Sequence, residues 1–240
     1  MVLRSMRISS RLFRLRSYRR KLHKLRSRLL LTSPVGRRWL RALILKECDR
    51  LAYAKLLREA LPLDGDVIEC GVFRGESLTH IAALVTDRAP HKRVFGLDSF
   101  DGFPTDTIRS ADLTEDRDRS LVSGRFRTDD DMAGRIMRVF GLLDLEAELV
   151  PGFFQDTLPQ FAGRRFCFVH LDCDLYESYG CCLEALYDSV TVGGVIVFDE
   201  YNDPAWPGAT KAIDEFFSTR PETVERLDAP WRSNYFVRKI

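Results

Sequence analysis

Short apolar runs, almost free of polar residues, alternate with segments of helical spacing along most of this chain. The apolar runs occupy residues 66–71, 93–98, 165–172 and 193–199. Strands that are apolar along their whole length must be covered on both faces, which is typical of a parallel sheet between two layers of helices. The alternation therefore predicts an α/β fold with a mostly parallel sheet.

The remaining segments predict how this sheet is completed. Apolar residues at helical spacing indicate helices at 37–61, 76–85, 132–143, 175–190 and 209–219. We expect the first of these helices to stop at Pro62, because proline cannot continue a helix. A short strand is predicted at 147–150, and strands at 224–227 and 234–238 could close the sheet as an antiparallel pair.

Residues 99–131 form a polar stretch rich in Asp, Arg, Ser and Thr. A connection of this length without helices or strands is uncommon inside a compact domain, and it is either a functional lid or disordered. We place the lid at about 104–131, within a domain that spans residues 35–240.

Charge divides the chain into two parts. Residues 1–46 contain 15 of the 37 Lys and Arg residues and no Asp or Glu, so the rest is acidic although the whole chain carries a net charge of +2. An acidic body is a poor ligand for a polyanion, so we expect the domain to bind no nucleic acid. We treat residues 1–34 as a basic arm, because Ser33-Pro34 breaks its helical pattern.

Apolar residues recur every three or four positions from Leu12 to Leu29 in the basic arm, and Arg and Lys fill most positions between them. This pattern predicts an amphipathic helix and leaves three interpretations open. The arm could lie on an anionic membrane surface, could bind a partner or form a homodimer through its leucines, or could be a solvated extension. An organellar transit peptide has a similar composition, whereas a secretory signal would need an apolar core.

Cysteine spacing and hydropathy bear on the compartment. The six cysteines show no C-x-x-C spacing, which argues against a zinc ribbon or a disulfide framework and suits a reducing compartment. No uninterrupted apolar run reaches about 18 residues, so we expect no helix that spans a bilayer. The sequence therefore predicts a cytoplasmic protein, peripheral to a membrane if the arm binds one.

The ends of the first three predicted strands favour a nucleoside-type cofactor, since ligands bind outside the carboxyl ends of such strands. Gly71 and Gly75 let the turn after the first strand approach a ligand closely, but this turn is not the G-x-G-x-x-G of dinucleotide sites. Asp98 ends the second strand, where it can accept hydrogen bonds from a ribose. Gly152 and Phe153 follow the third strand, where an adenine edge could be held. These features favour S-adenosylmethionine (SAM) over NAD.

Four carboxylates follow the next two strands, and they belong to Asp172, Asp174, Asp199 and Glu200. Neighbouring strands would bring them together, and their mutual repulsion is costly unless a cation or shared protons neutralise it. Oxygen ligands with few nitrogens select Mg²⁺ or a similar ion over zinc. The alternative for Asp174 and Asp199 is a role as caps of the helices that follow.

Four sequence blocks, in this order, together resemble the macrocin O-methyltransferase family. The blocks are ECGVFRGES at 69–77, GLDSFDGFP at 96–104, LDCDLYES at 171–178 and GGVIVFDEY at 193–201. The resemblance covers about residues 60–220 and implies the class I methyltransferase fold, which is Rossmann-like, with a mostly parallel seven-stranded sheet and helices on both faces. It implies a SAM- and metal-dependent enzyme that methylates sugar hydroxyls of natural products.

The resemblance also implies roles for single residues. Asp172, Asp199 and Glu200 would hold Mg²⁺, although the family often has two Asp where this chain has Asp199-Glu200. Asp174 would be the general base that takes the proton of the acceptor hydroxyl. The expected SAM site comprises Glu69, Gly71, Gly75, Ser77, Asp98, Ser99, Gly152, Phe153 and Asp172.

These observations predict a SAM-dependent O-methyltransferase, assisted by Mg²⁺, that acts on a sugar hydroxyl of a glycosylated natural product or a glycolipid. Two other interpretations stay open. A related hydroxylase-type enzyme could use the same scaffold, and a peripheral membrane protein could act through the basic arm and keep only a vestigial site.

Overall fold

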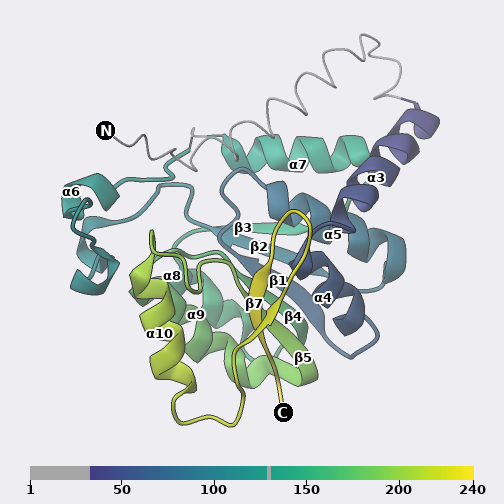
Figure 1. Cartoon of the computed structure of the whole chain (residues 1–240). Helices are drawn as coiled ribbons and strands as arrows, with labels where there is room; N and C mark the ends of the chain where they lie inside the picture. Colours follow the sequence, from purple (N-terminus) through teal and green to yellow (C-terminus); the bar gives the residue numbers. More distant parts are fainter. Residues whose placement is uncertain (1–32, 129–130) are drawn as a thin grey trace.

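One sheet of seven strands organises the computed structural model, which describes residues 33–128 and 131–240 (Figure 1). The strands are β1 (Asp66–Cys70), β2 (Val94–Asp98), β3 (Glu148–Pro151), β4 (Phe166–Leu171), β5 (Val190–Phe198), β6 (Glu225–Leu227) and β7 (Asn234–Arg238). Their order is β3-β2-β1-β4-β5-β7-β6, and β7 pairs antiparallel with both neighbours while the other pairs are parallel. The predicted α/β fold and the antiparallel closure are confirmed.

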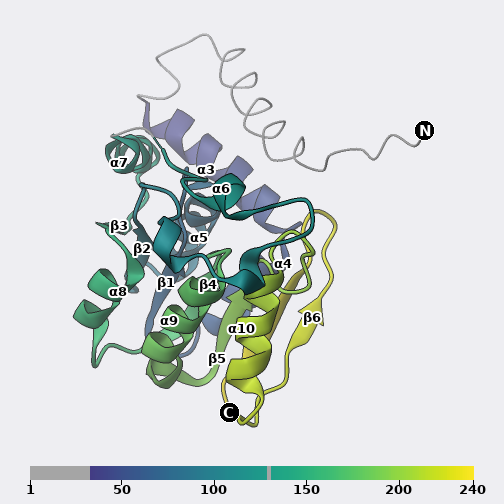
Figure 2. The same cartoon turned by 90° about the vertical axis from the view of Figure 1, so that its left-hand side faces the viewer.

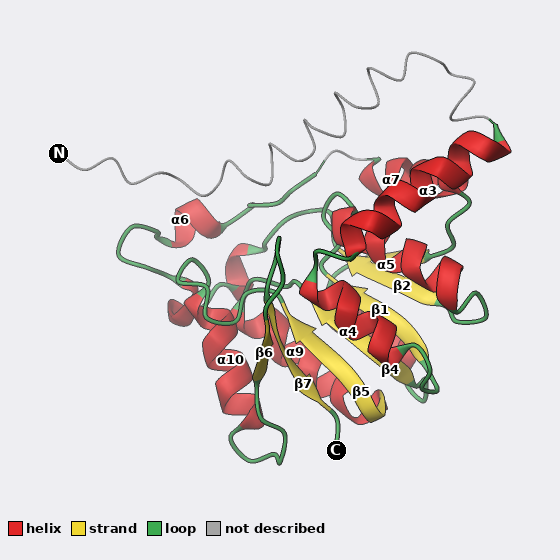
Figure 3. Cartoon of the chain, turned by 45° about the vertical axis from the view of Figure 1, so that its right-hand side comes forward, coloured by secondary structure: helices red, strands yellow, loops and turns green. Residues whose placement is uncertain are grey.

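Helices cover both faces of the sheet, as Figure 3 shows. One layer contains α3 (Pro34–Cys48), α4 (Ala52–Ala60), α5 (Glu76–Arg88) and α7 (Met132–Leu143), and the other contains α8 (Phe154–Thr157), α9 (Tyr176–Leu186) and α10 (Pro207–Phe217). Short 3-10 turns η3 (Leu158–Phe161) and η4 (Tyr187–Ser189) follow α8 and α9. Alternate residues of each central strand enter two separate apolar cores, so Val67 packs in one and Ile68 in the other. Burial on both faces explains why these strands are apolar throughout.

The single helix predicted at 37–61 is wrong, because the chain forms α3 and α4 with a break between them. Leu51 in the break makes an isolated bridge with Arg232. The Ala52 N–H donates to the Arg232 carbonyl over 3.0 Å, and the Trp231 N–H donates to the Arg50 carbonyl over 2.9 Å. The backbone of the break therefore pairs with the β6–β7 loop instead of continuing the helix. The predicted helix at 175–190 is also too long, since β5 already begins at Val190.

The expected lid forms a packed loop with short helical turns, namely η1 (Thr105–Thr107), η2 (Ser110–Asp112) and α6 (Arg119–Val122). Its ends are tied together, because the Gly124 N–H donates to the Phe103 carbonyl and the Thr128 N–H donates to the Phe100 carbonyl. Figure 2 shows this segment, in teal, reaching across to α10. We call residues 100–128 the cover segment.

The sheet reverses its strand order between β1 and β4, since the chain adds β2 and β3 on one side of β1 and then β4 and β5 on the other. A crevice at the carboxyl ends of the strands is expected at such a switch point.

The basic arm lies almost wholly outside the described residues, and so do its predicted helix and the three interpretations of it. Ser33 and Pro34 begin α3, where the Ser33 hydroxyl accepts a hydrogen bond from the Gly36 N–H. In the part of the chain that the structure describes, no helix is long and apolar enough to cross a membrane.

Candidate active site

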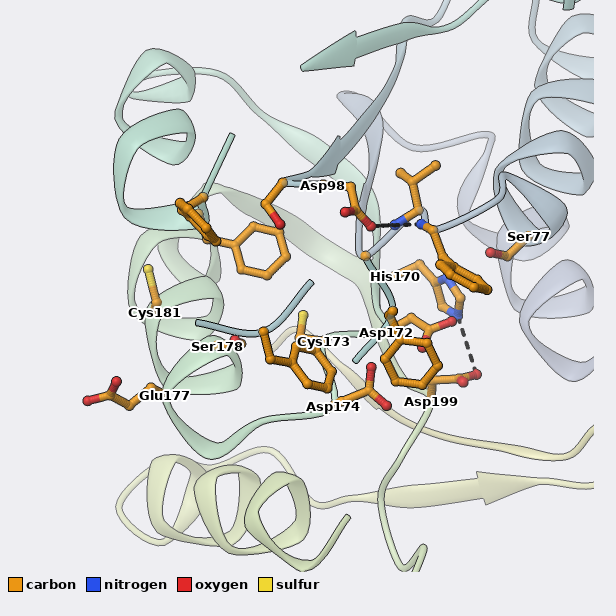
Figure 4. Close-up of a pocket in the computed structure, with 18 of the residues that line it drawn as sticks. Ser77, Asp98, His170, Asp172, Cys173, Asp174, Glu177, Ser178, Cys181 and Asp199 are labelled. Atoms are coloured by element: carbon orange, nitrogen blue, oxygen red, sulfur yellow. Dashed lines mark hydrogen bonds and ion pairs between the residues drawn. The ribbon is translucent and has the colours of Figure 1, made fainter. Parts of the chain in front are cut away.

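A cavity of about 1810 Å³ lies at the carboxyl ends of β1, β2, β4 and β5. This volume exceeds the roughly 300–1,000 Å³ of a site for one small ligand, so the cavity has room for two. Of the expected site residues, the following line it: Gly71, Ser77, Asp98, Ser99, Gly152, Phe153, Asp172, Asp174 and Asp199. Figure 4 shows part of this lining, with Asp172, Asp174 and Asp199 gathered on one side and Asp98 apart from them.

The turn after β1 explains why glycine stands at position 71. Gly71 has a φ of +95°, and a Cβ added there would overlap the backbone oxygen of Asp172. The Asp172 N–H in turn donates to the Cys70 carbonyl over 2.9 Å. The end of β1 and the end of β4 are therefore in direct backbone contact. Gly75, with a φ of +76°, is the residue before α5 and packs on Ile136 instead of lining the cavity.

Asp98 fastens this turn with its carboxylate. Its Oδ2 accepts hydrogen bonds from the backbone N–H groups of Val72 and Phe73 over 2.8 and 2.7 Å, and its Oδ1 accepts one from Phe100 over 2.6 Å. The first two of these contacts are dashed in Figure 4. Asp98 also lines the cavity. Each carboxylate oxygen has a second lone pair, so the expected bond to a ribose hydroxyl stays a prediction.

Glu69 lies away from the expected SAM site. Its side chain is fully buried, does not line the cavity and binds His170 Nδ1 over 2.8 Å. The Nε2 atom of His170 lies 3.9 Å from an Asp199 oxygen. Burial lowers the pKa of His170, but Glu69, Asp199 and Asp172 outweigh it, so the net pKa lies above its ordinary value. Glu69 therefore orients a buried histidine, and its contact with SAM stays a prediction.

Three carboxylates lie close enough to share an ion. Single oxygens of Asp172, Asp174 and Glu200 all lie within 4.8 Å of one another. Glu200 is buried, and it accepts hydrogen bonds from the Tyr179 hydroxyl over 2.8 Å and from the Asp174 N–H over 3.4 Å. Burial, followed by repulsion from the neighbouring carboxylates, raises the pKa of Glu200 well above its usual range. The surroundings of Glu200 therefore disfavour its charged form.

Asp199, which the expected set combines with Asp172 and Glu200, has a charged partner of its own. Its buried carboxylate forms an ion pair with the Arg232 guanidinium and is 3.4 Å from the Asn234 amide nitrogen. Burial lowers the pKa of Arg232, but Asp199 and the other carboxylates raise it by more, so the net pKa lies above its ordinary value. Arg232 thus forms an ion pair with Asp199, and the role of Asp199 as an Mg²⁺ ligand stays a prediction.

The donor set of this group fits a hard divalent cation. It offers only carboxylate oxygens, which are the ligands that Mg²⁺ prefers, and Arg232 is already paired with Asp199. An ion there would offset the repulsion that raises the pKa of Glu200.

Asp174 has an unusual backbone conformation at the wall of the cavity. Its φ is +62°, in the left-handed region that Asp tolerates better than most residues. It is buried yet lines the cavity, in the loop between β4 and α9. A strained backbone at a cavity wall is typical of functional positions.

Several cavity residues escaped the sequence analysis, because they come from α3, α4, α5 and the β6–β7 loop. The Tyr53 hydroxyl lies 3.0 Å from His80 Nδ1, and the Tyr53 ring lies 5.0 Å from the His170 ring. Trp231 and Arg232 line the same end of the cavity. Helical spacing indicates core positions for Tyr53 and His80, and no local signal links them with residues far along the chain.

Curated relatives of this chain are O-methyltransferases by name. The 8-demethyl-8-(2,3-dimethoxy-alpha-L-rhamnosyl)-tetracenomycin-C 4'-O-methyltransferase of Streptomyces olivaceus is 33% identical over 162 residues, which are 65% of this chain and 60% of that protein. The demethyldecarbamoylnovobiocin O-methyltransferase of Streptomyces niveus is 32% identical over 181 residues, 70% of this chain and 66% of that protein. The matches thus span slightly less than two thirds of these relatives.

Solved structures share the fold. The calicheamicin methyltransferase CalS11 superposes with a TM-score of 0.70 at 24% identity, over 99% of this chain and 94% of that one. The O-methyltransferase NovP superposes with a TM-score of 0.63 at 26% identity, over 82% and 79% of the two chains. The fold is therefore that of the class I O-methyltransferases. The model of the macrocin O-methyltransferase (TylF) family matches residues 30–236. The chain belongs to the macrocin O-methyltransferase family.

Proposed function

We propose that this protein transfers the methyl group of SAM to a sugar hydroxyl of a glycosylated natural product. Membership of the macrocin O-methyltransferase family supports the reaction. The name of the relative from Streptomyces olivaceus, which acts on a rhamnosyl tetracenomycin, supports the class of acceptor. A glycolipid offers the same hydroxyl chemistry and is the second acceptor to be tested.

One observation carries the proposal, namely the backbone contact between Gly71 and Asp172 inside a single cavity. The turn after β1 is suited to a nucleoside-type cofactor, and Asp172 opens the group of carboxylates. A methyl donor on the first and a hydroxyl on the second would therefore lie side by side. Such positioning supplies much of the acceleration in a transfer between two bound molecules.

The donor side of the cavity would be formed by Gly71, Ser77, Asp98, Ser99, Gly152 and Phe153. Gly71 lets the backbone come close to the sulfonium end, and Asp98 has lone pairs left for the ribose. Asp172 lies at the boundary of the two sides. Glu69 acts behind the site, through His170.

Mg²⁺ would be held by Asp172 and Glu200, two carboxylates being a common number for this ion. When bound, the ion lowers the proton affinity of a hydroxyl that it contacts. Asp199 stays with Arg232. This arrangement leaves Asp174 as the carboxylate at the cavity wall that accepts the proton of the acceptor hydroxyl as the methyl group arrives.

Calorimetric titration with S-adenosylhomocysteine, with and without Mg²⁺, tests the cofactor first. We expect binding in both conditions. Transfer of a labelled methyl group from SAM is then measured on rhamnosyl natural products and on a glycolipid, with and without a chelator. If S-adenosylhomocysteine binds in neither condition, the proposed methyltransferase activity is excluded. If it binds but the methyl group is transferred only to the glycolipid, the acceptor is a glycolipid.

A further inference from the structure

Asp112 is a fully buried carboxylate in the cover segment, outside the residues assigned above. Its Oδ2 accepts a hydrogen bond from the Arg109 N–H over 2.8 Å, within its own turn η2. Its Oδ1 accepts a hydrogen bond from the Tyr176 N–H over 2.7 Å. Tyr176 is the first residue of α9, 64 positions away along the chain. A buried carboxylate thus joins two distant segments.

The first turn of α9 needs such a partner. The N–H groups at the start of a helix have no acceptor within the helix, and a Ser, Thr, Asp or Asn in the preceding position usually supplies one. In α9 that position is Leu175, which makes no side-chain cap. Asp112 therefore caps α9 from another part of the chain, and its negative charge suits the positive end of the helix.

Two further contacts hold the same junction. The Arg109 guanidinium forms an ion pair with Glu177 in the first turn of α9. Gly208, near the start of α10, leaves room for the carboxylate, since a Cβ there would overlap Asp112 Oδ1. The cover segment, α9 and α10 thus meet around one side chain, and any residue larger than glycine at 208 would displace it.

The two segments that meet at this junction both line the cavity. The cover segment contributes Phe103, Thr107 and Phe126 to the cavity wall. The N-terminus of α9 comes two residues after Asp174, whose backbone is in the left-handed region. The cap therefore fixes at once the wall of the cavity and the loop that carries Asp174.

We propose that Asp112 is a positioning residue that locks the cover segment onto α9 and thereby holds Asp174 in place. The lock follows from the contacts alone, and only the part played by Asp174 rests on the proposed function. Loss of the carboxylate loosens the cover segment and the start of α9 together, and it leaves the turn after β1 unchanged.

Amide hydrogen exchange on the full chain tests the lock, with D112A and with the milder D112N, which keeps the shape of the side chain. Asp118 provides the matched control, because it caps α6 in the same cover segment but is local and exposed. We expect D112A to raise exchange about tenfold or more in peptides covering 104–122 and 174–182, with little change in 66–98. D118A should affect only the peptide around α6.

Affinity for S-adenosylhomocysteine separates positioning from general destabilisation. We expect the affinity of D112A and D112N to stay within about twofold of the wild type, while kcat for methyl transfer falls at least tenfold and the KM for SAM is unchanged. Faster exchange confined to the cover segment would overturn the lock, and so would an equal loss of cofactor affinity. If the wild type does not bind the cofactor, the proposed function fails while the exchange result still decides the lock.

Discussion

The two sides of the cavity are stabilised by different means. On the cofactor side, at the ends of β1 to β3, backbone groups make most of the contacts. Asp98 accepts hydrogen bonds from three backbone N–H groups, and Gly71 lets its backbone lie close to that of Asp172. On the carboxylate side, at the ends of β4 and β5, acidic side chains face one another, and Asp199 is neutralised by Arg232. The first side is held by hydrogen bonds to its carboxylate, whereas on the second side burial and neighbouring carboxylates disfavour the charged form of Glu200.

This difference has an energetic meaning. A carboxylate bonded to several backbone N–H groups is stable when charged, while clustered buried carboxylates raise one another's pKa and oppose folding. Substitutions on the cofactor side should therefore reduce stability and cofactor affinity together. Substitutions within the group of Asp172, Asp174 and Glu200 should reduce activity or metal affinity and leave stability equal or higher.

The largest expected effect comes from Asp174→Asn. Loss of a general base lowers turnover by about 10²- to 10⁴-fold. Affinity for S-adenosylhomocysteine, measured by calorimetry, should stay within about twofold, because the donor side is unchanged. Asp203 lines the same cavity, so D203N is the matched control and should change turnover only a few-fold. Normal turnover of D174N with the cofactor bound would remove Asp174 as the base.

Gly71→Ala probes the opposite side. The new Cβ combines an unfavourable φ with an overlap on the Asp172 oxygen, and we expect the free energy of unfolding to fall by about 2–4 kcal/mol. Cofactor affinity should fall with it. Gly163 has a φ of +79° but no neighbour for an added Cβ, so G163A isolates the backbone cost of about 1 kcal/mol. Equal losses in the two variants, measured by denaturant unfolding, would show that the contact contributes nothing.

Glu200→Gln should separate stability from metal binding. In the presence of a chelator we expect this variant to be more stable than the wild type by about 1 kcal/mol, because one charge leaves a crowded buried group. Its affinity for Mn²⁺, followed by electron paramagnetic resonance, should fall at least tenfold. A less stable variant with unchanged Mn²⁺ affinity would contradict the assignment.

Glu222 is the matched control for Glu200, since it is also buried but has donors around it. Burial raises the pKa of Glu222. Hydrogen bonds from Tyr187, two backbone N–H groups and Lys239 lower it by more, so its net pKa lies below 4.5. A depressed pKa stabilises the fold above about pH 4.5, and this stabilisation is lost as the pH falls through the lower folded value. E222Q should therefore lower the melting temperature at pH 7, with a smaller deficit near pH 4.

The smallest effect concerns the reactivity of the cysteine thiols. Burial raises the pKa of Cys173, which lies between Asp172 and Asp174, to about 12, and that of Cys48 to about 12. We expect neither thiol to react with a disulfide reagent at pH 8, because little thiolate forms. The half-buried Cys181 should react slowly. Rapid modification of Cys173 would mean that the loop carrying Asp174 opens readily.

That Gly71, Asp98 and Gly152 line one cavity was predictable from sequence, because the signals are local. The glycines of the turn and Asp98 follow strands that hydrophobicity alone indicates, and parallel strand ends meet at one edge. The contact of Glu69 with His170 was not predictable, because strand alternation alone cannot show that His170 lies beside it on β4.

The carboxylate side was predictable only in part. Its acidic residues lie in recognisable sequence blocks. The ion-pair partner of Asp199, however, is Arg232, on a loop without a recognisable sequence pattern. The break between α3 and α4 was missed for the same reason, since it pairs with that loop. The cap of α9 by Asp112 likewise joins segments that no local rule connects.

The backbone pairing between the α3–α4 break and the β6–β7 loop has a consequence for the timing of folding. Leu51 and Arg232 are among the earliest and latest described residues of the site, and they meet through backbone hydrogen bonds. During synthesis, β1 to β5 can form before residues 225–238 have left the ribosome. Until those residues emerge, Asp199 has no arginine and the α3–α4 break has no partner. The emerging chain can therefore form the parallel part of its sheet, β1 to β5, before the last two strands and the loop that carries Arg232 are in place.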